Sequence, residues 1–246
     1  MPLSALSFRE SSVARTEVAK ILPLRDLHRQ EMNCQIIHDS FALRGLSDPY
    51  AVTIDGHLAG YGLVANQYYE GAVCEFYLQP PYRRAALPIF HQLLEASRAT
   101  HIRTQTNDRQ LLLMLYDCAE NIVKDNYLFA DSLTTSLPSP GGALRKSGTE
   151  GQEEWVLELD GQPVAAGGLM FHYNPPYGDI YMEVNEAHRR QGFGSYMVQE
   201  LKRIAYEIGK IPAARCSPDN LISRQALEKA GMLPCGRILQ GQLPRR

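Results

Sequence analysis

The sequence has few cysteines, little net charge and no long apolar run, and each absence excludes a class of protein. Its five cysteines are widely scattered and contain no Cys-x-x-Cys pair, which argues against a zinc or redox motif. A net charge of −2 gives no support for a nucleic-acid surface. The longest apolar run, Leu111 to Tyr116, is far too short to span a bilayer, and no signal peptide is evident. We therefore expect a soluble, cytoplasmic protein with reduced cysteines.

One segment places glycines and arginines between a strand pattern and a helix pattern. Residues 179–184 are rich in β-branched and aromatic side chains, and apolar residues recur at helical spacing over residues 193–208. Between the two patterns lie Arg189, Arg190, Gly192 and Gly194. Such a turn leaves backbone N–H groups at the positive end of a helix, which suits a pyrophosphate. The alternative is a tight turn that packs the helix against the sheet.

Two common phosphate motifs are excluded at this turn. No Gly-Lys-Ser/Thr follows it, so it is not a Walker loop. Only two glycines occur and the arginines precede them, so it is not a dinucleotide-binding fingerprint either.

A second motif lies downstream and makes the pattern specific. Asn220 precedes a helix pattern that ends in Glu228, Lys229, Gly231 and Met232. Together the two motifs resemble the GNAT superfamily of acyl-CoA-dependent N-acyltransferases. The family's Arg/Gln-x-x-Gly-x-Gly/Ala turn is met by Arg189, Gly192 and Gly194. The resemblance is clear over residues 153–239.

The first half of the chain repeats the second in a degenerate form. Residues 50–63 and 155–169 each read as a strand, an Asp-Gly turn and a strand, and an Arg-Arg pair follows in both halves. In the first half, however, Ala86 and Pro88 replace the two glycines, which makes a poor phosphate cradle. Asn107 lies roughly where Asn220 does. The alternative is a chance similarity between two α/β units.

We therefore predict an α/β fold of two GNAT-like modules, each a mixed, mostly antiparallel sheet flanked by helices and splayed at its central strands. Residues 1–135 would form the degenerate module and residues 136–246 the acyl-CoA-binding module. Two helical patterns around Pro23 match the first two helices of the family, and the second half has no equivalent pair. We expect the first module to supply the substrate-side wall that the second one lacks.

The resemblance implies that acetyl-CoA is the acyl donor and that no metal is needed. The backbone of Glu183 and Val184 would pair with the pantetheine arm. The residues implied in cofactor binding are Val184, Arg189, Arg190, Gln191, Gly192, Phe193, Gly194, Ser195, Asn220 and Ser223. The two arginines equally fit a solvated surface, and Asn220 equally fits a helix N-cap.

The implied reaction is direct attack of a primary amine on the thioester. An alkylamine is mostly protonated at neutral pH and must first lose a proton, which a carboxylate can take directly or through water. Asp179 and Glu183 share one face of a strand. Asp179 lies where several family members keep a catalytic Glu, but Glu183 is nearer the splay and is our favoured base. The alternative is that both are exposed carboxylates at a strand end.

The thiolate side departs from the family pattern. Many members place a Tyr seven residues after the helix-opening Asn, and that position is Leu227 here. Which group protonates the leaving thiolate is therefore open. His172 is expected to be a satisfied strand histidine, with a base as the alternative, and Tyr173 and Tyr177 are expected to be packing residues.

The predicted function is N-acetyl transfer to an unidentified small-molecule or peptide amine, by a monomer or homodimer that binds neither nucleic acid nor membrane. Superfamily membership fixes the chemistry but not the acceptor or the acyl chain length. The alternative is a non-catalytic acyl-CoA-binding sensor, which the missing Tyr and the degenerate first module favour.

Overall fold

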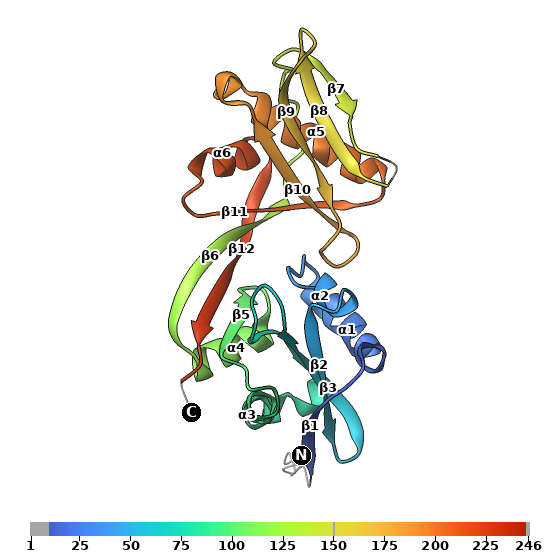
Figure 1. Ribbon diagram of the computed structural model, residues 1–246, viewed down its shortest axis with the longest axis vertical. Helices are drawn as coiled ribbons and strands as arrows, with labels where there is room; N and C mark the ends of the chain where they lie inside the picture. Colours follow the sequence, from blue (N-terminus) through green and yellow to red (C-terminus); the bar gives the residue numbers. More distant parts are fainter. Residues whose placement is uncertain (1–9, 150, 245–246) are drawn as a thin grey trace, which may run out of the picture. The chain divides into compact units, whose positions relative to one another are not determined.

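The computed structural model describes residues 10–149 and 151–244, which form two compact units. The first unit contains the described residues up to Cys34, His38–Lys124 and the residues from Ile238 onwards; the second contains Gln35–Ile37 and Asp125–Arg237. Two strands, β6 (Glu120–Asp131) and β12 (Met232–Gln242), begin in one unit and end in the other (Figure 1). The two compact units are therefore not separated by a single cut after residue 135. A boundary at residue 135 stays a prediction for the two functional modules.

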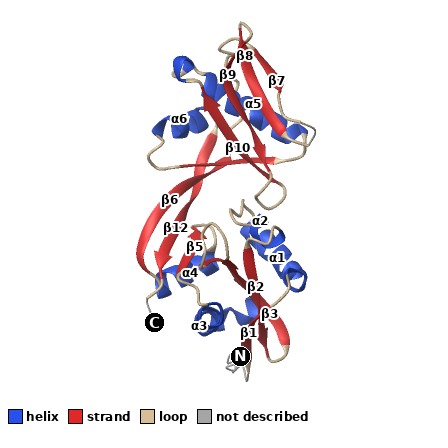
Figure 2. Cartoon of the chain, in the orientation of Figure 1, coloured by secondary structure: helices blue, strands red, loops and turns tan. Residues whose placement is uncertain are grey.

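The first unit is a sheet with helices packed against it (Figure 2). Its strands, in hydrogen-bonded order, are β1 (Ser11–Arg15), β2 (Ser47–Ile54), β3 (His57–Ala65), β4 (Ala72–Leu78), β5 (His101–Gln105) and the last part of β12. Neighbouring strands are antiparallel except for β4 and β5. Its helices are α1 (Val18–Met32), α2 (Ser40–Leu43), the 3-10 helix η1 (Pro80–Ala85), α3 (Ala86–Ser97) and α4 (Arg109–Cys118).

The second unit repeats this plan without the two initial helices. Its strands, in hydrogen-bonded order, are β6, β11 (Ile211–Cys216), β10 (Tyr177–Val184), β9 (Gln162–Met170), β8 (Glu153–Leu159) and β7 (Ala143–Lys146). Its helices are the 3-10 helix η2 (Glu186–His188), α5 (Phe193–Glu207) and α6 (Leu221–Lys229). Only β10 and β11 run parallel among these strands. The predicted mixed, mostly antiparallel sheets are thus confirmed.

Helix α5 supplies much of the core of the second unit. Its buried apolar residues are Phe193, Met197, Val198, Leu201, Ile204 and Ala205. They recur at three- and four-residue spacing, so they form one stripe that packs on the sheet. Ile208, which the same periodicity assigned to this face, follows the helix and is exposed.

The repeat predicted from the sequence is visible in two matching hairpins. Asp55 and Gly56 connect β2 to β3 with φ angles of 49° and 81°, and Asp160 and Gly161 connect β8 to β9 with 51° and 75°. Two central residues with positive φ are typical of the turn that fits the twist of a hairpin. Both hairpins also carry a register shift a few residues before the turn. Chance similarity is a poor explanation for these shared irregularities.

The helices near the N-terminus differ from the sequence-based prediction. Pro23 does not separate two helices but lies inside α1, whereas the second helix is the short α2. Proline costs a helix one backbone hydrogen bond, and Pro23 is only in the second turn, where α1 continues through it. None of the described helices is long and apolar enough to cross a membrane.

Candidate functional site

Strand β10 parts from β11 halfway along its length. Parallel pairing between the two strands covers Tyr177–Ile180, whereas antiparallel pairing of β10 with β9 continues to Val184. The edge of residues 181–184 that faces away from β9 therefore has no strand partner in this fully described stretch. An edge of this kind presents backbone N–H and C=O groups to an extended, peptide-like ligand. The predicted splay is confirmed.

A cavity of about 170 Å³ lies at the splay. It is lined by Met170, Asp179, Ile180, Tyr181, Met182, Arg215, Ser223 and Leu227. Asp179 thus faces a cavity, whereas Glu183 is exposed and is not among the lining residues. Leu227, which stands where many family members have a Tyr, contributes an apolar side chain with no proton to give.

The turn between β10 and α5 has the backbone conformation of an anion cradle. Arg190 and Gly192 have φ angles of 63° and 93°, and α5 begins at Phe193. Left-handed residues in a turn before a helix can bring successive N–H groups toward one point. A Cβ built on Gly192 would meet nothing within 4 Å, so the space in front of this turn is open. The open turn and its glycine fit a pyrophosphate.

Gly194 has a different role from Gly192. A Cβ at Gly194 would lie 3.3 Å from Met182 Cε and 3.4 Å from Val184 Cγ2. The missing side chain therefore lets the first turn of α5 approach β10 closely. The sequence left two interpretations of the Gly-x-Gly turn. An open phosphate-binding turn fits Gly192, and tight packing of the helix against the sheet fits Gly194.

Side chains around the turn mainly hold its backbone in place. Arg189 Nε donates to the carbonyl of Val184 at 3.2 Å, and Ser195 Oγ donates to the carbonyl of Gly192 at 3.1 Å. Gln191 Nε2 donates to the backbone carbonyl of Ala187 at 3.2 Å. Arg189, Arg190 and Gln191 are all exposed, whereas the side chains of Phe193 and Ser195 are buried.

Asn220 is the N-cap of α6. Its Oδ1 accepts a hydrogen bond from the backbone N–H of Ser223 at 3.0 Å, which satisfies one of the unpaired donors at the start of the helix. The corresponding N-cap of α4 in the first unit is Asp108, one residue after Asn107, and it accepts from Leu111 N. The N-cap alternative for Asn220 thus applies, and the cap also places Ser223 at the cavity.

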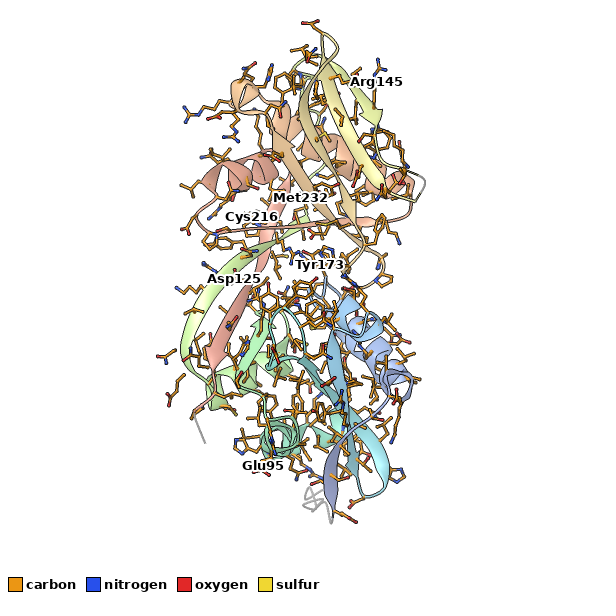
Figure 3. The ribbon with its side chains drawn as sticks, viewed as in Figure 1. Glu95, Asp125, Arg145, Tyr173, Cys216 and Met232 are labelled. Atoms are coloured by element: carbon orange, nitrogen blue, oxygen red, sulfur yellow. The ribbon has the colours of Figure 1, made fainter. Side chains whose placement is uncertain are left out.

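A buried charged cluster stands beside the cavity. The side chain of Asp179 is 2% exposed, and its Oδ2 lies 3.0 Å from Nε2 of His172 and 3.6 Å from Nε of Arg215. Tyr173, labelled in Figure 3, is in the same loop as His172. Burial, and then the charge of Asp179, raise the pKa of Tyr173 well above its ordinary value. Asp179 is therefore not an exposed strand-end carboxylate.

His172 is the residue whose position the sequence did not indicate. It lies in the loop between β9 and β10, not in a strand, and its ring approaches Asp179 across the start of β10. Seven residues separate the two along the chain, and no periodicity relates a loop to a strand. The pair forms only because the chain reverses between β9 and β10.

The equivalent region of the first unit is occupied by its own side chains. Parallel pairing of β4 with β5 ends at Val73, so this sheet is splayed as well. Gln110 Oε1 accepts from the backbone N–H of Leu78 at 2.9 Å, and Arg83 Nε donates to the carbonyl of Leu78 at 3.0 Å. Counted from the N-cap, the residue of α6 that matches Gln110 is Ile222, which has no hydrogen-bonding side chain.

The turn before α3 also lacks the cradle geometry. Residues 80–85 form η1, which runs directly into α3, and the N–H of Ala86 bonds back to the carbonyl of Arg83. No residue from 79 to 97, all of them described, has a positive φ. In the first unit, the backbone N–H groups of this segment therefore point along a helix and do not face an open turn. The absence of both glycines predicts this difference.

A buried ion-pair network fills the space between α1 and the sheet of the first unit. Arg25 donates to both carboxylate oxygens of Glu75, from NH2 at 2.7 Å and from Nε at 3.1 Å, and also reaches Asp39. Tyr61 donates to Glu75 at 2.7 Å. Burial alone would raise the pKa of Glu75, but the charge and hydrogen bonds of Arg25 lower it. This carboxylate is neutralised internally and is unsuited to acid–base work.

The segment Gln35–Ile37 packs with the second unit, although it lies between the first two helices of the chain. Gln35 Nε2 donates to the carbonyl of Phe129 at 3.1 Å, and the N–H of Ile36 donates to Asn174 Oδ1 at 2.6 Å. Gln35, Ile36 and Asn174 are all buried. The second unit thus takes part of its packing from a loop between helices that its own half of the chain does not encode.

Comparison with known proteins identifies the family. Residues 33–132 match the family model of the acetyltransferase (GNAT) domain, and residues 126–232 match that of the acetyltransferase (GNAT) family. The chain belongs to the GNAT acetyltransferase family. It contains two GNAT domains in tandem, as the internal repeat predicted.

Individual relatives of this tandem GNAT protein agree with the family assignment. It is 30% identical over 96 residues to the uncharacterized N-acetyltransferase YjdG of Bacillus subtilis (strain 168), a match that spans 37% of this chain and 56% of that protein. Its fold is similar to that of a GNAT-family acetyltransferase from Colwellia psychrerythraea, with a TM-score of 0.77, 15% identity, and coverage of 95% of this chain and 100% of the other. A tandem GNAT protein from the clavulanic acid biosynthesis pathway matches with a TM-score of 0.62 and 12% identity, over 96% of this chain and 100% of the other.

Proposed function

We propose that this GNAT protein transfers the acetyl group of acetyl-CoA to a primary amine, and that only the second unit binds the donor. The observation that carries the proposal is the splay of β10 and β11 beside an open cradle. The backbone edge at Glu183 and Val184 would pair with the pantetheine arm. The amides from Gln191 to Ser195 would hold the pyrophosphate at the positive end of α5.

The contrast between the two units supports a single donor site. The second unit has an open turn at Gly192 and a free strand edge, whereas the first has η1 and the Gln110–Leu78 hydrogen bond in the same places. In the second unit, the residue one turn before Leu227 on α6 is Ser223, which lines the cavity. We propose that Ser223 and the amide nitrogen of Asn220 contact the pantetheine arm, and that Arg189 and Arg190 add positive charge near the phosphates.

The acceptor amine would lose its proton on the Asp179 side of the cavity. Glu183 adjoins the splay, as the sequence predicted, but it is exposed to water. The buried cluster around Asp179 is therefore a better candidate for the base than Glu183.

Binding of CoA to matched variants tests the location of the donor site. Gly192→Val places a β-branched residue at a φ of 93°, which it cannot adopt without strain, and fills the open side of the cradle. Ala86→Val introduces the same residue at a helical position of the first unit, with a φ of −56°. Calorimetry should show that Gly192→Val loses at least ten-fold in CoA affinity and that Ala86→Val keeps the wild-type value. Equal losses in both variants would mean that the donor site is misassigned.

Release of the CoA thiol with a panel of amines tests the reaction. The panel should include amino acids, polyamines, small alkylamines and peptide N-termini, because family membership does not choose among them. Turnover with any of them supports the transferase. CoA binding without turnover on any amine would favour the acyl-CoA sensor, which the apolar Leu227 in the cavity makes the second candidate. The oligomeric state and the cytoplasmic location stay predictions.

A further inference from the structure

We infer that His172, held by Asp179, is the group that takes the proton from the acceptor amine. The inference rests on the proposed function and assigns the base within the same site. Asp179 is then a positioning residue, and His172 is the catalytic residue. The carboxylate was the expected base from the sequence, so the assignment replaces both Glu183 and Asp179 in that role.

The distance between the two side chains decides which imidazole nitrogen carries a proton. Nε2 of His172 lies 3.0 Å from Oδ2 of Asp179. Nη2 of Arg215, which can only donate, lies 3.3 Å from the same Nε2. The contact with the carboxylate is the shorter of the two, and a carboxylate can only accept, so we place the proton of the neutral ring on Nε2, directed at Asp179. In the neutral ring Nε2 is then the donor, and Nδ1 carries the lone pair that can accept a proton. A carboxylate that orients a histidine in this way is a common arrangement for general bases.

Arg215 keeps Asp179 from acting as the base itself. Nε of Arg215 lies 3.6 Å from the same Oδ2, so this carboxylate oxygen is already engaged by a cation as well as by the imidazole. Asp179 is also 2% exposed, whereas the side chain of His172 is 21% exposed and so has access to solvent. An imidazole nitrogen can both accept and release a proton, as a general base must.

The other groups that face His172 do not compete for the proton. Its ring contacts Tyr173 at a centroid distance of 4.8 Å, and the raised pKa of Tyr173 keeps that hydroxyl neutral. Arg215 of β11 also lies over the Tyr173 ring, 5.9 Å from its centroid, and Cys235 of β12 lies near Tyr173. Asp179 is therefore the charged partner of the imidazole on β10, and Arg215 is the one on β11.

The proton balance of the step is simple. Nδ1 of neutral His172 takes one proton from the acceptor ammonium and passes it to solvent. The amine nitrogen then forms a C–N bond to the thioester carbonyl carbon, and the C–S bond breaks with its electron pair on sulfur. The second proton of the nitrogen goes to this thiolate. The products are the amide, the free thiol and one released proton.

Substitutions at His172 separate a base from a structural residue. His172→Gln keeps a side-chain N–H for Asp179 but cannot accept a proton at neutral pH, whereas His172→Ala removes both functions. Both variants should lose about 100-fold or more in kcat with an acceptor that wild type uses. Glu207→Gln, a carboxylate change at an exposed position at the end of α5, should stay within about three-fold of wild type.

The pH profile of kcat/KM gives the second readout. With an acceptor amine of high pKa, the limb that reflects the imidazole should be present in wild type and absent in His172→Gln. If His172→Gln had the wild-type rate and the wild-type pH profile, the ring would only support the loop, and the inference would be wrong. An inactive wild type would instead overturn the proposed function.

A measurement without substrates checks the pairing itself. Nitrogen-15 NMR of the histidine rings, with His172→Gln used to assign the signal, should show the Nε2–H tautomer for His172 at pH above its titration. Asp179→Ala should alter that signal, because it removes the acceptor of the proton on Nε2. An unchanged tautomer in Asp179→Ala would remove Asp179 from its positioning role.

Discussion

The side-chain carbonyl of Gln110 accepts a hydrogen bond from the backbone N–H of Leu78, at the edge of β4 that β5 has left. Leu78 ends β4 as Val184 ends β10, and arginines five residues later bond to both carbonyls. The first unit thus satisfies this backbone N–H with one of its own side chains. In the second unit, the corresponding strand edge is proposed to bind the acyl donor. The helical turn without glycines and the Gln110 side chain both occupy backbone groups at the positions that match the proposed donor site.

Removal of the Gln110 side chain should not create a second donor site. Gln110→Ala leaves the Leu78 N–H without its partner and should cost roughly 1 kcal/mol of stability. The turn before α3 remains helical in this variant, so calorimetry should still give one CoA per chain. Gln225→Ala, at an exposed position of α6, serves as the stability control. A stoichiometry of two in Gln110→Ala would mean that Gln110 alone closes the first site.

The Arg25–Glu75 pair should show strong coupling. Arg25→Met leaves a buried carboxylate without its main cation, which should destabilise the chain by about 3–5 kcal/mol in urea unfolding. The double variant Arg25→Met with Glu75→Met should recover part of that loss, because no charge is then left buried. Arg15→Met breaks an ion pair in which the arginine is mostly exposed and should cost less than about 1 kcal/mol. Additive losses in the double variant would contradict the coupling.

Two buried groups of the first unit should make stability depend on pH in opposite directions. The pKa of Glu75 is lowered in the folded state, so its contribution is present above the ordinary value of about 4.3 and is lost as pH falls below it. Burial lowers the pKa of His28, but the hydrogen bond and charge of Asp108 raise it above its ordinary value. The His28 contribution is therefore present below about 6.5 and is lost as pH rises through its folded pKa.

Thermal unfolding across pH can separate these two contributions. Glu75→Gln should flatten the acid side of the stability curve and leave the neutral side unchanged in shape. His28→Gln should flatten the decline above neutral pH. If His28→Gln instead removed stability equally at every pH, the histidine would contribute by packing rather than by its charge.

Asn174 should matter for the acceptor and not for the donor. Asn174→Ala removes the acceptor of the Ile36 N–H and loosens the segment that packs with the second unit. If that segment helps to form the substrate-side wall, KM for the acceptor should rise several-fold while the CoA dissociation constant stays the same. An unchanged KM for the acceptor would mean that this segment does not form part of the substrate-side wall. Deleting residues 1–135 is a weaker test, because it also removes the part of β6 that pairs with β11.

The turn geometry of the proposed donor site could be predicted from the sequence because it is local. Gly192 has a positive φ, and two Asp-Gly hairpins mark the repeat, so short stretches carry this information themselves. The acceptor half could not be read in this way. Asp179 was recognised as a carboxylate on the right strand, but its burial depends on Arg215 and His172, which come from another strand and a loop. Pro23 misled the helix prediction because tertiary packing of α1 outweighs the lost hydrogen bond.

The sequence by itself determined the tandem repeat, the helical turn before α3 and the glycine turn with positive φ before α5, because a few neighbouring residues fix backbone angles and helix ends. Only the tertiary structure decided which side chains meet: Gln110 with Leu78, His172 with Asp179, and Gln35–Ile37 with the second unit. These pairs form when distant segments are buried together, and burial rewards total packing rather than any pattern of neighbours along the chain.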